Sequence, residues 1–290
     1  QGAYNQARDY ANNRVQGTRA DAKGKKRPAM IIEHPDVKRM LMDMKSKTES
    51  IRALALYTSY CFDVSKRHPI SEKRVKFSER VSLLTPIVKA WATDKAIKIA
   101  DIGIQIHGGM GYIEESGASQ YWRDARITPI YEGTNGIQAL DLIGRKFNIH
   151  NGLIINQYLD EINKFLDNNK DNNRMQKFIK LFEPSYNDLK DCINFIKEIE
   201  LTNSQEINAH ALDFLNIFAL VAVGYTWLEF IHVSISKNEE NKDDFYLSKI
   251  QLGDFYLTKV IFETKKYKNN IYSSGKLYNE FEDKFFEAGI

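Results

Sequence analysis

The sequence predicts an all-α fold, an up-down helical bundle followed by a second helical domain. Apolar residues recur at three- and four-residue steps over most of the 290 residues. Beyond residue 148 no alternating segment is long enough for a sheet, and no internal repeat of fixed period occurs. With 43% hydrophobic and 27% charged residues, the chain can bury one large core or two modest ones.

The first part of the chain predicts two long helices. From Val37 one apolar stripe runs through Met40, Leu41, Met44, Ile51, Leu54 and Ala55. Pro35 and Asp36 suit its first turn, because proline is preorganised there and an acid complements the helix dipole. After a turn near His68, a second stripe predicts a helix from about Ser71 toward Ile106, through Leu84, Ile87, Val88, Trp91, Ile97 and Ile104.

Residues 108–131 carry four glycines and one proline without helical periodicity, which predicts an ordered loop or broken helix. Such loops often hold functional sites. Helix resumes near Thr134. Beyond Asn148 the composition changes, and "LDNNKDNNR" is a polar break. We therefore predict domains at 1–149 and 150–290, the second with helices at roughly 151–167, 174–199, 206–236, 243–268 and 276–288.

Charge and cysteine content narrow the function classes. Lysine and arginine exceed aspartate and glutamate by nine in residues 1–150 and fall short by six in 151–290. Without a nucleic-acid motif this excess is too small to favour DNA or RNA. The two cysteines form no CxxC motif, so no metal site is expected and a reducing, cytoplasmic location fits. The longest apolar run, 217–228, is too short to span a membrane, and the N-terminus has no signal pattern.

The most unusual segment is 103–138. Its glycines do not have the spacing of a dinucleotide-binding loop and follow a helix rather than a strand. The strings "QIHGGMGY", "WRDARI" and "IYEGT", in register, resemble the C-terminal helical domain of the acyl-CoA dehydrogenases. The resemblance covers about residues 1–145 and includes "NNRVQGT". The wording of these motifs and the long C-terminal extension are most similar to the subgroup containing 3-methylmercaptopropionyl-CoA dehydrogenases.

By itself Glu132, near a helix start, is better interpreted as a helix-start acid than as a base. The resemblance implies that Glu132 is the catalytic base of an FAD-dependent acyl-CoA dehydrogenase, removing the α-proton of an acyl-CoA thioester while the β-hydrogen leaves as hydride. A free glutamate has a pKa of about 4.3, so burial beside an acyl chain and flavin is expected to raise it. Hydrogen bonds from the base's own N–H and the flavin ribityl group would stabilise the enolate.

The resemblance also implies cofactor-binding residues. Arg14 matches an arginine that contacts the flavin pyrophosphate across a dimer interface, although alone it would be a solvated charge. Gln105 and Gly109 match flavin-contacting positions, the glycine because backbone can approach closely there. Thr134 matches a hydroxyl beside the cofactor, with helix capping as a compatible role.

Tyr131 and Gly133 flank the base and are expected to bind substrate at the thioester end of the pocket, with turn packing as the alternative. We expect His107 to be packed and hydrogen-bonded, and Arg123 to tie the loop down. The basic segment 17–28 is expected to be a mobile loop, with attraction of the CoA phosphates as the alternative.

Some positions depart from the family pattern. Pro35 replaces a glutamine near the flavin, and Gln16 and Gly136 replace a threonine and a glutamine. The N-terminal helical and central β domains are absent, so the chain alone is expected to be inactive and to bind flavin weakly or not at all. Expected partners are acyl-CoA, an electron-transfer flavoprotein and further copies in a homodimer or tetramer. Alternatives are an acyl-CoA oxidase-like flavoprotein and a non-catalytic helical interaction module.

Overall fold

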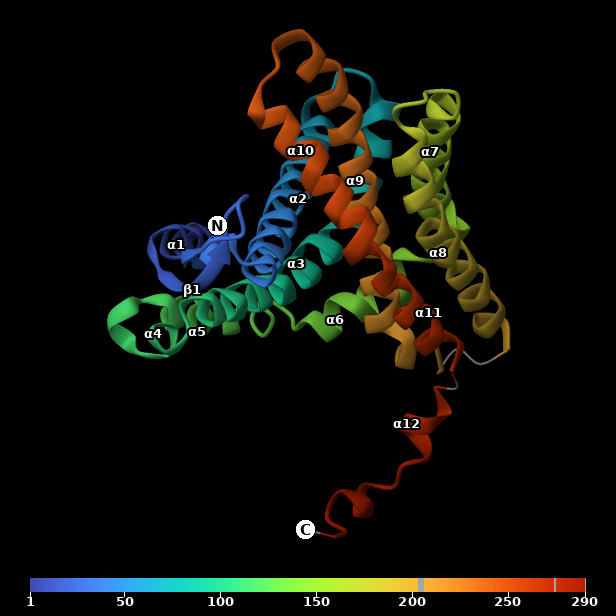
Figure 1. Cartoon of the computed structure of the whole chain (residues 1–290). Coiled ribbons are helices and arrows are strands. Elements are labelled where there is room, and N and C mark those ends of the chain that lie inside the picture. Colours follow the sequence, from blue (N-terminus) through green and yellow to red (C-terminus); the bar gives the residue numbers. More distant parts are fainter. Residues whose placement is uncertain (203–205, 274, 290) are drawn as a thin grey trace.

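The computed structural model describes residues 1–202, 206–273 and 275–289. Figure 1 shows an array of helices with one small hairpin at its side. The all-α prediction is therefore confirmed for the body of the chain. The first part contains α1 (Gly2–Asn13), β1 (Val15–Ala20), β2 (Lys26–Met30), η1 (Ile31–Glu33), α2 (Pro35–Arg67) and α3 (Ser71–His107).

The two long helices, α2 and α3, begin and end close to the predicted positions. Pro35 and Asp36 lie in the first turn of α2, with His34 as its N-cap. Lys66 and Arg67 lie in its last turn, where they complement the negative end of the helix dipole. The short connection at His68–Ile70 returns the chain, and α2 packs along α3.

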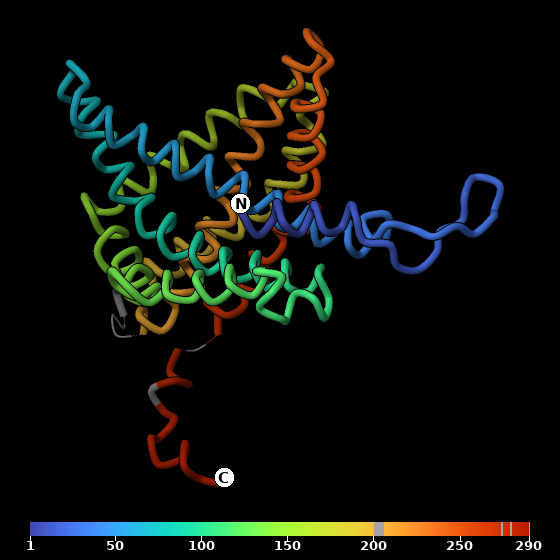
Figure 2. Tube along the Cα trace, turned by 90° about the vertical axis from the view of Figure 1, so that its left-hand side faces the viewer, coloured from blue at the N-terminus to red at the C-terminus, as the bar shows by residue number. Residues whose placement is uncertain are grey.

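The basic segment 17–28 was predicted as a mobile loop, and the structure shows strands in place of the loop, while mobility stays a prediction. It forms the antiparallel hairpin β1–β2, which projects from the body in Figure 2. At its tip the Asp21 carboxylate accepts hydrogen bonds from the backbone of Lys23 and Lys25, and Gly24 adopts a φ of 77°. Arg27 donates two hydrogen bonds to Glu33, at 3.0 and 2.6 Å, which closes the base. The hydrogen bonds of the turn and the ion pairs of Glu33 with Arg27 and Arg19 therefore hold this hairpin.

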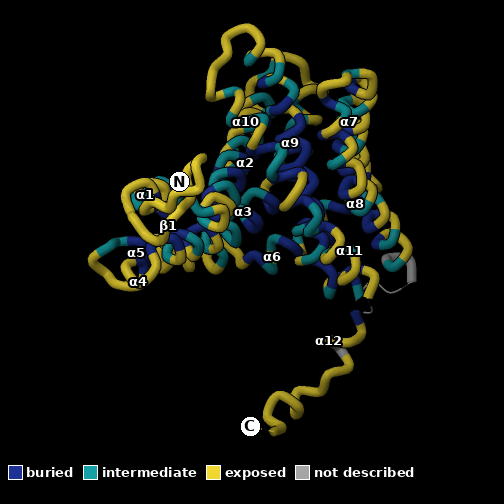
Figure 3. Tube along the Cα trace, viewed as in Figure 1, coloured by how far each residue is buried: buried dark blue, intermediate teal, exposed yellow. Residues whose placement is uncertain are grey.

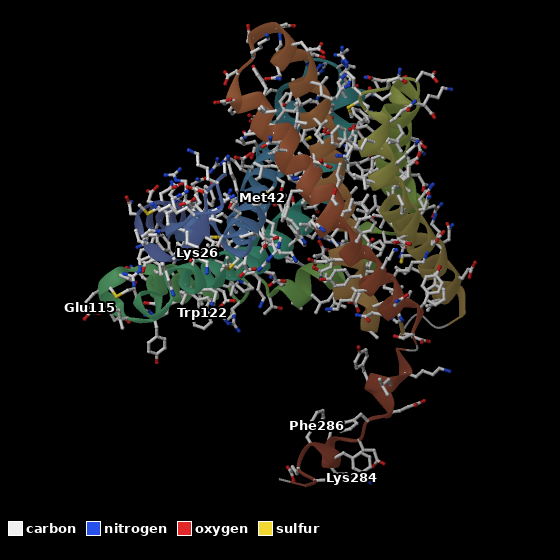
Figure 4. All side chains as sticks on the ribbon, viewed as in Figure 1. Lys26, Met42, Glu115, Trp122, Lys284 and Phe286 are labelled. Carbon is white, nitrogen blue, oxygen red and sulfur yellow. The ribbon has the colours of Figure 1, made fainter. Side chains whose placement is uncertain are left out.

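Residues 109–146 form a succession of short turns, as predicted for a broken helix. They comprise α4 (Gly109–Tyr112), η2 (Glu114–Ser116), α5 (Ala118–Arg126), α6 (Asn135–Leu140) and the π-helical turn η3 (Asp141–Lys146). Arg123 of α5 is joined to η2 through two hydrogen bonds to Glu114, at 2.6 and 2.8 Å. The structural role expected of Arg123 is confirmed. Glu115 and Trp122 lie on the outer side of this segment (Figure 4).

The second part is helical throughout its described residues, apart from short connections. It contains η4 (Ile149–Gly152), α7 (Leu153–Asn169), α8 (Gln176–Thr202), η5 (Glu206–His210), α9 (Ala211–Asn241), α10 (Asp244–Phe255), η6 (Tyr256–Val260), η7 (Ile261–Glu263), α11 (Thr264–Tyr272), α12 (Lys276–Glu280) and η8 (Asp283–Phe286). The helix expected at 276–288 is wrong: only the short α12 and η8 form, and this segment extends from the body with Phe286 near its end (Figure 4).

The core runs through both parts of the chain (Figure 3). Buried residues of α3, α6 and η3, including Leu84, Trp91 and Leu142, belong to the same apolar cluster as those of α7 to α11. His150 and Asn151, at φ of 51° and 57°, break the helix between the two parts. The boundary near residue 150 stays a prediction: the chain bends there, while the buried surface continues across it.

The central helix is α9, which is apolar on every face and therefore surrounded by other helices. By length and composition the segment Glu206–Asn241, 36 residues with a mean hydropathy of 1.7 in its most apolar window, would be able to cross a membrane. Within the fold 78% of that window is buried. The neighbours in this chain, α2, α3, α6, α8, α10 and α11, cover its apolar surface.

Candidate active site

A cavity of about 840 Å³ opens where the C-terminal end of α3 meets α1, β1 and α4. It brings together three residues that are distant in the sequence, Arg14, Gln105 and Gly109, all of which the sequence analysis had assigned to cofactor binding. The remaining lining residues are Tyr10, Gln16, Gly17, Ile31, His34, Val37, Met40, Ile106, His107, Gly108 and Met110. The lining of this cavity therefore combines polar and cationic side chains with apolar ones.

The polar groups of this cavity are free to bind. Within the described part of the chain, the side chains of Arg14 and Gln105 make no hydrogen bond or ion pair, and both are exposed. A Cβ atom placed on Gly108 or Gly109 would meet no atom within 4 Å, so the backbone there faces open space. A guanidinium with paired donors, an amide and an accessible backbone suit a phosphate-bearing ligand with a flat ring system.

Two histidines shape the same cavity. His107 is 5% exposed, its Nδ1 donates to the Gly103 carbonyl at 2.7 Å, and its ring stacks on Tyr10 with centroids 4.4 Å apart. The packed, hydrogen-bonded role predicted for it is confirmed. His34 donates from Nε2 to the Gln16 carbonyl at 2.8 Å. The sequence analysis gave neither His34 nor Gln16 a place here, because residues that meet only through tertiary packing leave no local pattern.

Glu132 lies on a tight turn between α5 and α6. Its φ is 53°, in the left-handed region that costs a non-glycine residue roughly 1–2 kcal/mol. Gly133 follows with a φ of 82°. The hydroxyl of Thr134 accepts a hydrogen bond from the backbone N–H of Ile137 at 3.3 Å. Thr134 is therefore the N-cap of α6, and Glu132 is left without a capping role.

This turn is tied to the middle of α3. Lys89 Nζ donates to the Gly133 carbonyl at 2.7 Å and to Asn135 Oδ1 at 2.9 Å. Asn135 is 7% exposed, and its Nδ2 donates to the Ala90 carbonyl at 2.9 Å. Sequence reasoning missed both Lys89 and Asn135. A lysine within a helix carries no local signal, and Asn135 reads as an ordinary residue of a helix start.

The predicted site residues thus fall into two groups. Tyr131, Glu132, Gly133 and Thr134 do not line the cavity that contains Arg14 and the other cofactor-binding candidates. Lys89 and Gln105 are sixteen positions apart on α3, which at 1.5 Å per residue separates the turn from the cavity by about 24 Å. In Figure 1, α4 and α6 lie apart, with α5 beside α4.

The burial expected around the base is not provided by this chain. The Glu132 side chain is exposed, Tyr131 is 49% exposed, and Glu132 makes no hydrogen bond or ion pair with the described residues. Apolar side chains near it in the sequence are uncovered as well: Ile127, Ile130 and Ile137 are 53%, 47% and 56% exposed. A segment that exposes both a carboxylate and several apolar side chains has the composition of one wall of a pocket.

Two family models match the chain. The model described as "Acyl-CoA dehydrogenase, C-terminal domain" matches residues 1–147, and the one described as "Acetyl-CoA dehydrogenase C-terminal like" matches residues 158–281. The gap between them contains the left-handed residues at 150 and 151. Together they account for nearly all the helical elements described above.

Individual relatives agree with this match. The 3-methylmercaptopropionyl-CoA dehydrogenase of Ruegeria pomeroyi is 48% identical over 145 residues, which are 50% of this chain and 24% of that protein. A butyryl-CoA dehydrogenase of Syntrophomonas wolfei is 33% identical over 267 residues, 89% of this chain and 43% of that protein. The crystal structure of an acyl-CoA dehydrogenase from Bacillus anthracis complexed with FAD has the same fold, with a TM-score of 0.71 at 17% identity, over 98% of this chain and 47% of that one. This chain spans less than half the length of these relatives.

Proposed function

Because the chain belongs to the acyl-CoA dehydrogenase family, we propose that it is the C-terminal part of an FAD-dependent enzyme that dehydrogenates an acyl-CoA thioester between its α and β carbons. Glu132 is the catalytic base in this proposal. The observation that carries it is the backbone of Glu132: an acid held in a left-handed conformation, without a cap or an ion pair within the described residues. Strain of this kind concentrates at functional sites.

The cavity residues fit FAD, the ligand of the Bacillus anthracis relative. In our proposal Arg14 binds the pyrophosphate, Gln105 supplies an amide to the nucleotide, and Gly109 allows close approach of the ligand to the backbone. Thr134 offers its hydroxyl near the base. Since the turn and the cavity lie about 24 Å apart along α3, we propose that the cavity serves the cofactor of a second copy in a homodimer or tetramer.

The chemistry assigned to this chain is proton transfer. FAD, when bound, supplies the acceptor for the hydride that leaves the β-carbon. The Glu132 carboxylate takes the proton from the α-carbon, and the Glu132 backbone N–H donates a hydrogen bond to the thioester oxygen, where negative charge develops. Tyr131 and Gly133 line the thioester end of the pocket. The parts of the enzyme outside this chain close over the exposed carboxylate and exclude water from it.

The rest of the proposal follows from this role. An electron-transfer flavoprotein is the proposed acceptor of the electrons, and no membrane span or nucleic acid is involved. The buried free thiols Cys61 and Cys192 fit the proposed cytoplasmic location.

The test is a Glu132→Gln substitution in the full-length enzyme. The amide keeps the size of the side chain and cannot accept the proton, so flavin reduction by acyl-CoA is expected to slow by about 10²–10⁴-fold, the usual contribution of a general base. Glu115→Gln is the matched control, because Glu115 is also an exposed acid on the same broken helix. Normal turnover in the Glu132→Gln enzyme would exclude Glu132 as the base.

A further inference from the structure

We propose that Lys89 and Asn135 are positioning residues that hold Glu132 in place for proton abstraction. The inference rests on the proposed function, since it assigns a task in the same reaction. Neither residue would contact the substrate in this view. They act through the backbone of the turn that carries the base.

We call the hydrogen bonds that join Lys89 and Asn135 to the turn around Glu132 the brace. Lys89 provides the first half of this brace. Its ammonium group donates to the Gly133 carbonyl at 2.7 Å and to Asn135 Oδ1 at 2.9 Å. This carbonyl belongs to the peptide group between Gly133 and Thr134, one residue after Glu132. A charge-assisted hydrogen bond is shorter and stronger than one between neutral groups. The orientation of the turn is therefore coupled to a half-buried cation on α3.

Asn135 provides the second half. Its Nδ2 donates to the Ala90 carbonyl at 2.9 Å and to Asp94 Oδ1 at 2.8 Å. These two acceptors on α3 therefore hold the NH2 end of the Asn135 amide in place. Its backbone N–H donates to the Pro129 carbonyl at 3.0 Å and closes the turn from the other end. Because Asn135 is 7% exposed, no solvent replaces these partners when one is removed.

The task of this brace follows from the backbone of Glu132. Its left-handed φ of 53° persists only where the surroundings impose it. Contacts to the Gly133 carbonyl and to Asn135 fix the peptide groups on the C-terminal side of Glu132, and the Asn135–Pro129 bond fixes the loop that leads into it. A turn that relaxed would move the carboxylate by an ångström or more, and a displacement of about 1 Å in a reacting group can cost about 10²-fold in rate.

A second lysine, Lys146, also bonds to α3, but it does so away from the turn that carries Glu132. Lys146 makes a comparable tie from the next turn of the chain, donating to Ser82 Oγ at 2.6 Å. Its side chain is also mostly buried, at 11% exposure. It joins η3 to α3 without touching the residues around Glu132. Lys146 is therefore a matched control: a lysine of the same region whose polar partners, Ser82 and Asp141, lie outside residues 129–135.

The experiment compares Lys89→Met, Lys89→Arg and Lys146→Met in the full-length enzyme, with steady-state turnover of acyl-CoA and single-turnover reduction of the flavin both measured. For Lys89→Met we expect kcat to fall about 10–100-fold, with KM changed less than about 3-fold. Lys89→Arg keeps the charge and the donors, and most of the rate is expected to return. Lys146→Met should leave kcat near the wild-type value even where its melting temperature falls as much.

A second readout does not depend on activity. In the 290-residue chain, glycine-selective ¹⁵N labelling reports the amide of Gly133 by NMR. Lys89→Met should shift this signal, and Lys146→Met should not. Should the Lys89→Met protein fail to fold, Lys89→Gln, which keeps a polar amide but loses the charge, is judged by the same kinetic and spectroscopic criteria.

The outcomes separate this inference from the proposed function. If Glu132→Gln slows the reaction while Lys89→Met behaves like Lys146→Met in kcat, the positioning role is wrong and the base assignment stands. If Glu132→Gln retains normal turnover, both are wrong. An Asn135→Ala enzyme with an unchanged kcat would also overturn the positioning role, because that variant breaks the brace from the other side.

Discussion

Arg80 on α3 should be essential to the joint stability of the two parts of the chain. Its guanidinium binds Glu161 of α7 through two hydrogen bonds, at 3.2 and 2.8 Å, and donates to the Tyr57 hydroxyl at 3.0 Å. It also lies over the ring of Tyr158 at 4.5 Å. Arg80 thus connects α2 and α3, from residues 1–149, with α7 of residues 150–290. Lys89, the proposed positioning residue, lies on the same helix.

The magnitude follows from burial. The Arg80 side chain is 6% exposed and that of Glu161 is 33% exposed. Breaking a fully buried pair costs about 3–5 kcal/mol. Because the remaining carboxylate has partial access to water, we expect about 2–3 kcal/mol for Arg80→Met, including the loss of the cation–π contact. For a chain of this size that corresponds to a fall of roughly 4–12 °C in melting temperature.

Differential scanning calorimetry on the 290-residue chain measures this effect. Arg39→Met is the matched control, because the Arg39–Asp36 pair is 59% and 72% exposed and should contribute less than about 1 kcal/mol. Since one core spans both parts, we expect the whole chain to unfold in a single transition. A Tm of the Arg80→Met protein equal to that of the Arg39→Met protein would refute the assigned energy. Two separate transitions would show that residues 1–149 and 150–290 are independent units.

Three further predictions concern burial. Gly224→Ala on α9 should destabilise the chain by about 1–3 kcal/mol, because the new Cβ would lie 2.6 Å from a buried isoleucine. In the control Gly144→Ala the new Cβ meets nothing within 4 Å, so this variant should be neutral or stabilising by up to about 1 kcal/mol. Equal midpoints of urea unfolding for the two variants would contradict this prediction. Burial raises the pKa of the Cys192 thiol to about 12, and Cys61 is buried as well, so a thiol reagent should label neither in the folded chain and both after unfolding. Rapid labelling of the folded chain would argue against the described packing. Burial also lowers the pKa of His210 below its ordinary 6.5. Because the imidazole is protonated at a higher pH in the unfolded chain than in the folded chain, the free energy of unfolding should fall as pH drops below about 6.5. His210→Asn should lose less stability than the wild type between about pH 7.5 and 5.5, and equal losses in urea unfolding would be inconsistent with a neutral, buried imidazole.

The sequence by itself determined the helices and the position of the unusual segment. Pro35 at a first turn, the break near His68 and the apolar stripe of α3 are local signals, and local signals suffice to begin, end and orient a helix. The glycine-rich motif starting at Gln105 and the string around Glu132 likewise predicted the family before any contact was known. The hairpin β1–β2 was missed, because a charged, glycine-containing segment has no apolar alternation to indicate strands.

Only the tertiary structure decided which of these residues meet. It brought Arg14 to the end of α3 beside Gln105, placed Glu132 on a different turn about 24 Å away, and joined that turn to Lys89. It also packed apolar residues from both parts of the chain into one cluster around α9. Helical periodicity depends on neighbours three and four positions apart, whereas these contacts depend on how whole helices pack, and packing is set by all the side chains at once.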